Sequence, residues 1–135
     1  MSPEREAIVR SWYRKAASDL AYAELGLRSG ATFRAGAVYH CQQAAEKAIK
    51  ALICLSGVTP PRNHDLVRLI ELLLPSFDLR AFLEDAEFLT PMATEFRYPG
   101  ECEQPTDAEA EMCLHSASRI FTEAERVIRE NIGIS

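Results

Sequence analysis

Apolar residues recur at three- and four-residue steps along nearly the whole chain, which is the spacing of amphipathic helices. No stretch shows the strict apolar–polar alternation of a half-buried strand. The spacing predicts helices over about residues 3–29, 32–56, 64–74, 79–97 and 106–128. Because the third of these is short, we expect an all-α fold, an up-and-down four-helix bundle with a short additional helix.

Residues typical of helix ends support these bounds. Ser2 precedes a proline and is the candidate first cap, and Gly30 is a natural stop. Asn63 is the candidate cap of the short helix, and the letters TDAE at 106–109 spell a capping box. Pro91 falls inside the fourth segment, where a proline either kinks a helix or makes it restart.

The stretch YHCQQAAEKAIKAL, residues 39–52, pairs a side of small apolar residues with a distinct polar arc. At about 100° per residue, the polar arc holds His40, Gln43, Lys47 and Lys50. One interpretation is a solvated face with salt bridges to neighbouring helices. The other is a surface that meets a symmetric partner or a phosphate-bearing ligand, because these side chains donate hydrogen bonds.

Length and charge narrow the class of protein. The 135 residues favour a single domain over 1–135, and 47% hydrophobic with 26% charged residues is a globular balance. The net charge of −5 argues against a general nucleic-acid coat protein. Locally, however, residues 31–50 carry three cations against one carboxylate, whereas residues 82–111 carry nine carboxylates against one arginine. The net charge therefore does not exclude a local basic site.

The four cysteines form no C-x-x-C pair, so a zinc ribbon is excluded and we expect no metal and no cofactor. The charged start MSPEREAIVR is unlike a signal peptide, and no apolar run approaches the length of a membrane span. These features favour a reduced, cytoplasmic protein.

The segments FRAGAVYHCQQAAEKAIKALICLSG, NHDLVRLIELL and EFRYPG, with WYRKAASDLAYAE before them, resemble the HEPN family of small helical domains. The resemblance covers about residues 12–128. It implies a bundle that forms homodimers, a minimal nucleotidyltransferase as partner, and roles in toxin–antitoxin or RNA-processing systems. Catalytic members of the family are metal-independent ribonucleases that carry an arginine followed, after four to six residues, by a histidine.

Arg97 occupies the position of that arginine, but no histidine follows at the required spacing. Arg34 and His40 also have the arginine–histidine spacing of the motif, but they lie on a different helix from the one that carries it in the family. Their side chains lie about 120° apart around that helix. His64, beside Asp65, is a weak candidate for a replacement base, although a capping turn explains it more simply. His115 is expected at the core boundary of the last helix.

We therefore expect a homodimeric binding module that pairs with a nucleotidyltransferase and binds nucleotide or RNA, and a non-enzymatic role is favoured because the motif lacks its histidine. The alternatives are a metal-independent ribonuclease with a non-standard site, for which Arg97 and His64 are weak catalytic candidates, and a purely structural dimerisation bundle. The binding residues predicted for the first function are His40, Gln43, Lys47, His64, Asp65, Arg97 and Tyr98.

Overall fold

The computed structural model describes residues 1–96, 99 and 104–134. The described residues form three long helices, α1 (Pro3–Arg28), α2 (Arg34–Leu55) and α5 (Asp107–Ile132), and two short ones, α3 (Leu66–Leu72) and α4 (Leu83–Leu89). Three 3-10 turns, η1 (Ala31–Phe33), η2 (Arg80–Phe82) and η3 (Thr90–Ala93), complete the elements. No strand occurs among these residues, so the all-α prediction is confirmed.

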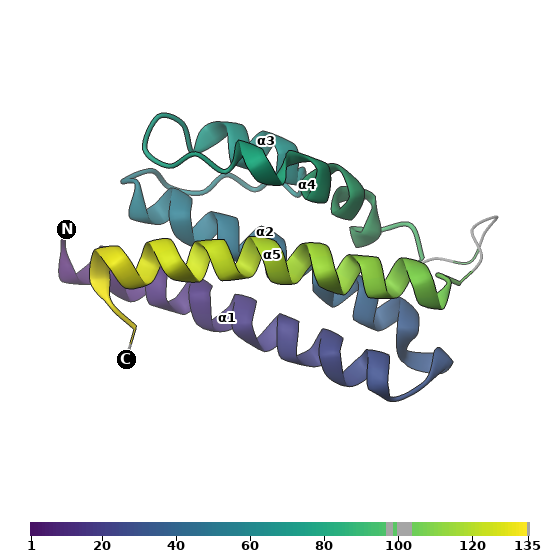
Figure 1. Cartoon of the computed structure of the whole chain (residues 1–135). Coiled ribbons are helices and arrows are strands. Elements are labelled where there is room, and N and C mark those ends of the chain that lie inside the picture. Colours follow the sequence, from purple (N-terminus) through teal and green to yellow (C-terminus); the bar gives the residue numbers. More distant parts are fainter. Residues whose placement is uncertain (97–98, 100–103, 135) are drawn as a thin grey trace.

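The long helices run side by side along the length of the molecule (Figure 1). Helix α2 lies behind α5 and runs in the same direction, whereas α1 runs the opposite way beneath them. Helices α3 and α4 form a shorter layer above, and the two termini lie at the same end (Figure 1). No helix in the described residues is both long and apolar enough to cross a membrane.

Local sequence explains the helix ends. The Ser2 hydroxyl accepts a hydrogen bond from the Arg5 backbone N–H at 3.1 Å, as a first cap should. Thr106 and Glu109 form the predicted capping box at the start of α5. The prediction of Asn63 as the cap of α3 was wrong, because the Asp65 carboxylate accepts from the first free N–H groups of that helix.

The fourth predicted helix is the main departure from the expected elements. Within 79–96, α-helix covers only Leu83–Leu89, with a 3-10 turn on each side. Pro91 stands in the first turn of η3, where its missing N–H interrupts the α-helical hydrogen bonding. The expected outcomes were a kinked helix or a restart, whereas the α-helix ends at Leu89 and the chain continues as a 3-10 turn over Thr90–Ala93.

The small residues of α2 serve packing within the chain. Ala37, Ala44, Ala45 and Ala48 are all at most 2% exposed. A Cβ added to Gly26 of α1 would lie 3.0 Å from the Cβ of Ala37, so the two helices approach as closely as their side chains permit. The Ala-rich side is thus buried against neighbouring helices, and it offers nothing to a partner chain.

Candidate functional site

A narrow strip of α2 stays uncovered between α1 and the segment that leads into α3. It consists of Gly36, Tyr39, His40, Gln43 and Lys47, and we call it the α2 strip. The rest of the helix from Ala37 onward is buried. The predicted polar arc therefore reaches the surface at three of its four residues, while the fourth, Lys50, is buried.

The first charged cluster joins α1 to the α2 strip. The buried Asp19 of α1 accepts from the Lys47 ammonium at 2.6 Å through one carboxylate oxygen. Its other oxygen lies 2.8 Å from Nδ1 of His40. The Asp19 side chain is only 10% exposed, whereas that of His40 is 34% exposed. The Asp19 carboxylate thus lies below the surface, and Lys47 and His40 lie above it.

Aromatic rings surround His40. The Tyr22 ring stacks on the His40 ring with centroids 5.4 Å apart, and the Tyr39 ring meets it edge-on at 5.5 Å. Tyr22 is 59% exposed, so one flat face of a large aromatic side chain remains open to solvent beside the imidazole. These ring contacts fix the plane of the imidazole, and the hydrogen bond to Asp19 fixes the position of Nδ1.

A second cluster lies beside the first on α2, around Glu46 and Lys50. The Glu46 carboxylate lies 2.7 Å from Nδ1 of His64 and 3.1 Å from the Lys50 ammonium. The Gln42 amide donates both to this carboxylate and to the His64 carbonyl oxygen, each at 3.2 Å. The Glu46 side chain is 5% exposed but that of His64 is 70% exposed. Lys50 itself lies over the Trp12 ring, 5.7 Å from the centroid.

The two clusters have the same composition. In each, a buried carboxylate holds one lysine and one histidine, and the histidine carries the most exposed side chain. Because each carboxylate accepts a hydrogen bond from Nδ1 of its histidine, Nε2 of each ring is left available to another group. The sequence analysis offered two interpretations of this arc, salt bridges to neighbouring helices and a surface for a ligand. Both are compatible with these residues.

The remaining predicted site residues fall into three groups. Gln43 reaches the α2 strip and donates to the Gln42 amide oxygen at 2.7 Å. Asp65 is used as the cap of α3. Arg97 and Tyr98 lie outside the described residues, so the predicted approach of the α2 arc to Arg97 stays a prediction.

Two other sequence predictions can be compared with the structure. Arg34 donates to the Pro105 carbonyl at 3.2 Å and pairs with Asp107 at 3.4 Å, so the guanidinium is engaged away from His40, as expected for a chance match. His115, expected at the core boundary, is fully on the surface of α5. It lies almost opposite the buried Ala117 and Ile120 around that helix, which is why the prediction was wrong.

The thiols are poor candidates for chemistry. Cys41, Cys54 and Cys113 are buried and free. Burial raises the pKa of the Cys41 and Cys54 thiols, and it raises the pKa of Cys113 to about 12. Thiolates are therefore scarce at neutral pH. The described part of the chain contains no group of three or more potential metal-ligating side chains.

Sequence reasoning missed the two residues on which both clusters depend. Asp19 lies three residues after Ala16 and four before Ala23, so it occupies the apolar stripe of α1. A charged residue in that register is the signal that would have identified it, since a buried charge needs a partner. Glu46 was placed only at the edge of the polar arc, although it is at the centre of the second cluster.

Comparison with known proteins identifies the fold. The HEPN domain profile matches residues 9–127. TT1696 from Thermus thermophilus is similar in structure, with a TM-score of 0.77, 27% identity, and coverage of 87% of this chain and 96% of that one. ST0689, an archaeal HEPN homologue, gives a TM-score of 0.73 at 28% identity, covering 89% and 97%. No curated protein matches significantly. With its profile match over most of its length, this chain belongs to the HEPN domain family.

Proposed function

We propose that this chain is a homodimeric HEPN module that binds a phosphate-bearing ligand, a nucleotide or RNA, over the α2 strip and His64. One observation carries the proposal. Two buried carboxylates each hold a lysine and a histidine, and Lys47, His40 and His64 reach the surface above them while Lys50 stays buried. Ammonium and imidazolium groups are donors suited to phosphate oxygens.

The charge balance of the site differs from that of the chain. The charges of Lys47 and Lys50 cancel those of Asp19 and Glu46, so the two clusters carry no net negative charge. The whole chain carries −5. The two clusters therefore repel a phosphate less than the chain as a whole does, and binding through Lys47 should weaken as salt rises.

Tyr22 adds a feature that favours a nucleotide over inorganic phosphate. Its exposed ring stacks on His40, directly beside the cations of the first cluster. Aromatic rings next to a basic strip provide stacking platforms for bases, and such stacking is tolerant of base identity. The ligand chemistry supported best is therefore a base linked to phosphate.

Homodimerisation and pairing with a minimal nucleotidyltransferase belong to the same proposal, and membership of the HEPN family supports them. The buried free cysteines suit a reducing compartment, which supports a place in the cytoplasm. Co-purification with the product of a neighbouring nucleotidyltransferase gene tests the pairing, and light scattering at micromolar concentration tests the dimer.

Binding of a fluorescent oligouridine, measured by anisotropy over a range of salt concentrations, tests the ligand site. The variant Lys47→Gln keeps a hydrogen bond to Asp19 but removes the charge. We expect weaker binding and a logarithmic salt slope smaller in magnitude by about 0.7, the value for one lost contact to a single strand. Arg80→Gln, a cation exposed on η2, is the matched control and should change neither quantity. Equal binding by Lys47→Gln and the unmodified chain would refute the site.

A second candidate function is metal-independent ribonuclease activity with His40 or His64 as the base. The observation that favours it is the carboxylate on Nδ1 of each ring, at 2.8 Å and 2.7 Å, which orients a histidine for proton transfer at Nε2. Cleavage of RNA in the presence of EDTA, lost in His40→Gln or His64→Gln but kept in His115→Gln, would support it. Cleavage unaffected by either substitution would exclude it.

A further inference from the structure

Helix α1 carries two separate hollows on its outward side. Figure 1 shows α1 at the lower edge of the bundle, with no other helix beyond it. One hollow, which we call the Trp12 hollow, has a volume of about 290 Å³ and is lined by Ala7, Ile8, Ser11, Trp12 and Lys15. The other, the Tyr22 hollow, has a volume of about 260 Å³ and is lined by Ser18, Ala21, Tyr22 and Leu25. The proposed ligand site includes Tyr22 but no residue of the Trp12 hollow.

The two hollows have similar walls. Each sets an aromatic ring beside an aliphatic side chain, Ile8 in the first and Leu25 in the second, and these two side chains are 50% and 54% exposed. Both volumes fall just below the range of about 300–1,000 Å³ that is usual for ligand pockets. Each hollow therefore suits a fragment such as one base, for which an aromatic side chain is a sequence-tolerant contact.

Both aromatic rings also reach α2. The Tyr22 ring stacks on His40 of the α2 strip, with centroids 5.4 Å apart. The Lys50 ammonium of α2 lies 5.7 Å from the centroid of the Trp12 ring. The two hollows thus open along the border between α1 and α2, where the proposed ligand site lies.

The stretch of α1 between the two rings is cationic. Around the helix, Lys15 lies about 60° from Trp12 and about 20° from Tyr22, and along the axis it is between them. Its exposed ammonium has no partner among the residues that the structure describes. Asp19, the one acidic residue of α1 between the rings, is paired with Lys47. Phosphates that run from one ring to the other would therefore meet two ammonium groups and no unpaired carboxylate of α1.

The separation of the rings sets the length of a ligand that could reach both. Trp12 and Tyr22 lie ten positions apart, which is about 15 Å along α1. Stacked nucleotides rise about 3.4 Å each along one strand. About five nucleotides are therefore needed to bring one base to each ring, and a mononucleotide can reach only one hollow.

We propose that the Trp12 hollow is a second base-binding site, and that the ligand of this chain is a single strand of about five or more nucleotides rather than a mononucleotide. One base contacts Tyr22, another enters the Trp12 hollow, and Lys15 binds the phosphates between them. This inference rests on the proposed function and adds the length of its ligand. Because one strand carries both bases, the second contact forms intramolecularly, and affinity should rise with length more than either contact alone provides.

Fluorescence of Trp12 tests the second site directly, because the chain contains one tryptophan. Unlabelled UMP and oligouridines of up to about eight nucleotides, a length within the usual single-strand footprint, are titrated into the full chain. We expect quenching of Trp12 to begin at about five nucleotides, since shorter ligands occupy only the Tyr22 hollow. Equal quenching by all lengths, or no quenching by a strand that binds, would overturn the inference.

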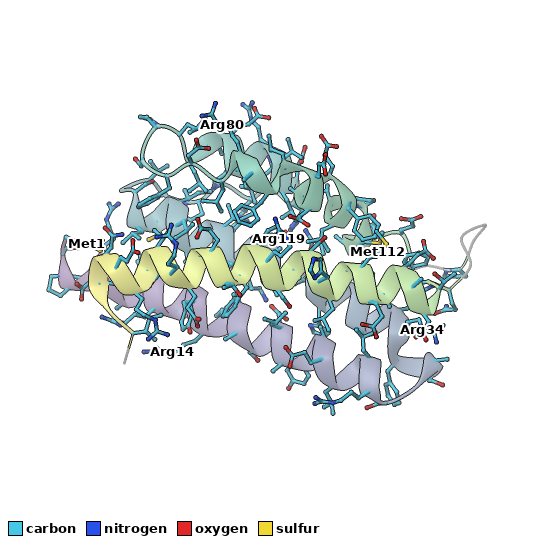
Figure 2. The ribbon with its side chains drawn as sticks, viewed as in Figure 1. Met1, Arg14, Arg34, Arg80, Met112 and Arg119 are labelled. Carbon is cyan, nitrogen blue, oxygen red and sulfur yellow. The ribbon has the colours of Figure 1, made fainter. Side chains whose placement is uncertain are left out.

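Substitutions on α1 test the path of the strand by competition anisotropy. Lys15→Gln should reduce the logarithmic salt slope for the longest oligouridine by about 0.7, the value for one lost contact to a single strand. Trp12→Leu should weaken binding of that strand roughly tenfold, as for one lost base contact, and so lower its affinity relative to UMP. Arg14→Gln is the matched control and should change neither quantity, because Arg14 lies in a separate hollow with Ile128 and Ile134, beside the C-terminal segment (Figure 2).

The outcomes separate this inference from the proposed function. Binding that depends on Lys47 but has the same salt slope in Lys15→Gln, without quenching of Trp12, would overturn the second site alone. It would assign the Trp12 hollow to an occupant other than nucleic acid. Binding that is independent of Lys47 would overturn the proposed site and, with it, this extension along α1.

Discussion

Helices α2 and α5 both carry charged residues, but they place them in opposite ways. The charges of α2 are tied to buried carboxylates, since Lys47 and His40 pair with Asp19 of α1, and Lys50, itself buried, pairs with Glu46. Along α5 the ion pairs of Arg126 with Glu123 and Glu130 lie in the open. Buried pairs cannot be broken without stranding a charge, whereas exposed pairs exchange readily with water.

The comparison shows that charged residues of the same types contribute differently to stability on the two helices. Charges on α2 are bound to the fold, so substitutions there should affect stability and ligand binding together. On α5, the ion pairs of Arg126 lie in the open, so its substitution should have little effect on stability, whereas Glu125 is bound to Tyr13 of α1. Four substitutions test this division.

The largest effect is expected for Glu46→Gln. It leaves the Lys50 ammonium buried without a counter-charge, and removal of one partner of a buried pair costs about 3–5 kcal/mol. Urea denaturation followed by circular dichroism measures the loss. The double variant Glu46→Gln/Lys50→Met should recover most of it, because no buried charge remains unpaired. A loss below about 1 kcal/mol would mean that the cluster is effectively hydrated.

A smaller loss is expected for Asp19→Asn. The asparagine retains one hydrogen-bond acceptor, and Lys47 is exposed enough to turn its ammonium toward solvent. We expect a loss of about 1–3 kcal/mol in the free energy of unfolding, by the same denaturation measurement. A loss larger than that of Glu46→Gln would reverse the order of the two clusters and contradict the burial argument.

The pH dependence of stability should reveal the contact between α1 and α5. Burial, followed by the hydrogen bond to Glu125, raises the pKa of Tyr13 to about 12. A raised folded-state pKa means that the stabilisation is complete below pH 10 and disappears as the pH rises toward about 12. The stability gap between the unmodified chain and Tyr13→Phe should therefore narrow over that range in pH-jump denaturation. A constant gap would contradict the assignment.

The smallest effect is expected for Arg126→Ala on α5. Both of its ion pairs are exposed, and such pairs are each worth about 0–1 kcal/mol. Thermal unfolding should show a shift within a few degrees of the unmodified chain. A large loss would mean that the fold depends on the charges of α5 as much as on those of α2.

Sequence spacing was sufficient for the long helices, because each has an apolar face of many residues and a clear start such as Ser2 or the Thr106 capping box. It was insufficient for the region around α4, where short turns of α and 3-10 helix satisfy the same apolar spacing and only Pro91 indicates a break. The cap of α3 was misplaced by two residues because Asn63 and Asp65 are equally good capping types.

The candidate site was only partly predictable for a related reason. The α2 strip follows from helical periodicity within one segment. The partners of its residues do not, because Asp19 comes from α1 and His64 from the loop before α3. Contacts between distant segments depend on how helices pack, and no spacing within one helix reports that.

Side-chain NMR of the three histidines during titration with oligouridine tests the central claim most directly. His40 and His64 belong to the α2 site, whereas His115 lies exposed on α5 and is an internal control. The account predicts that the Nε2 and Cε1 signals of His40 and His64 shift with the ligand while those of His115 stay in place. Shifts at His115 with none at His40 and His64 would contradict it.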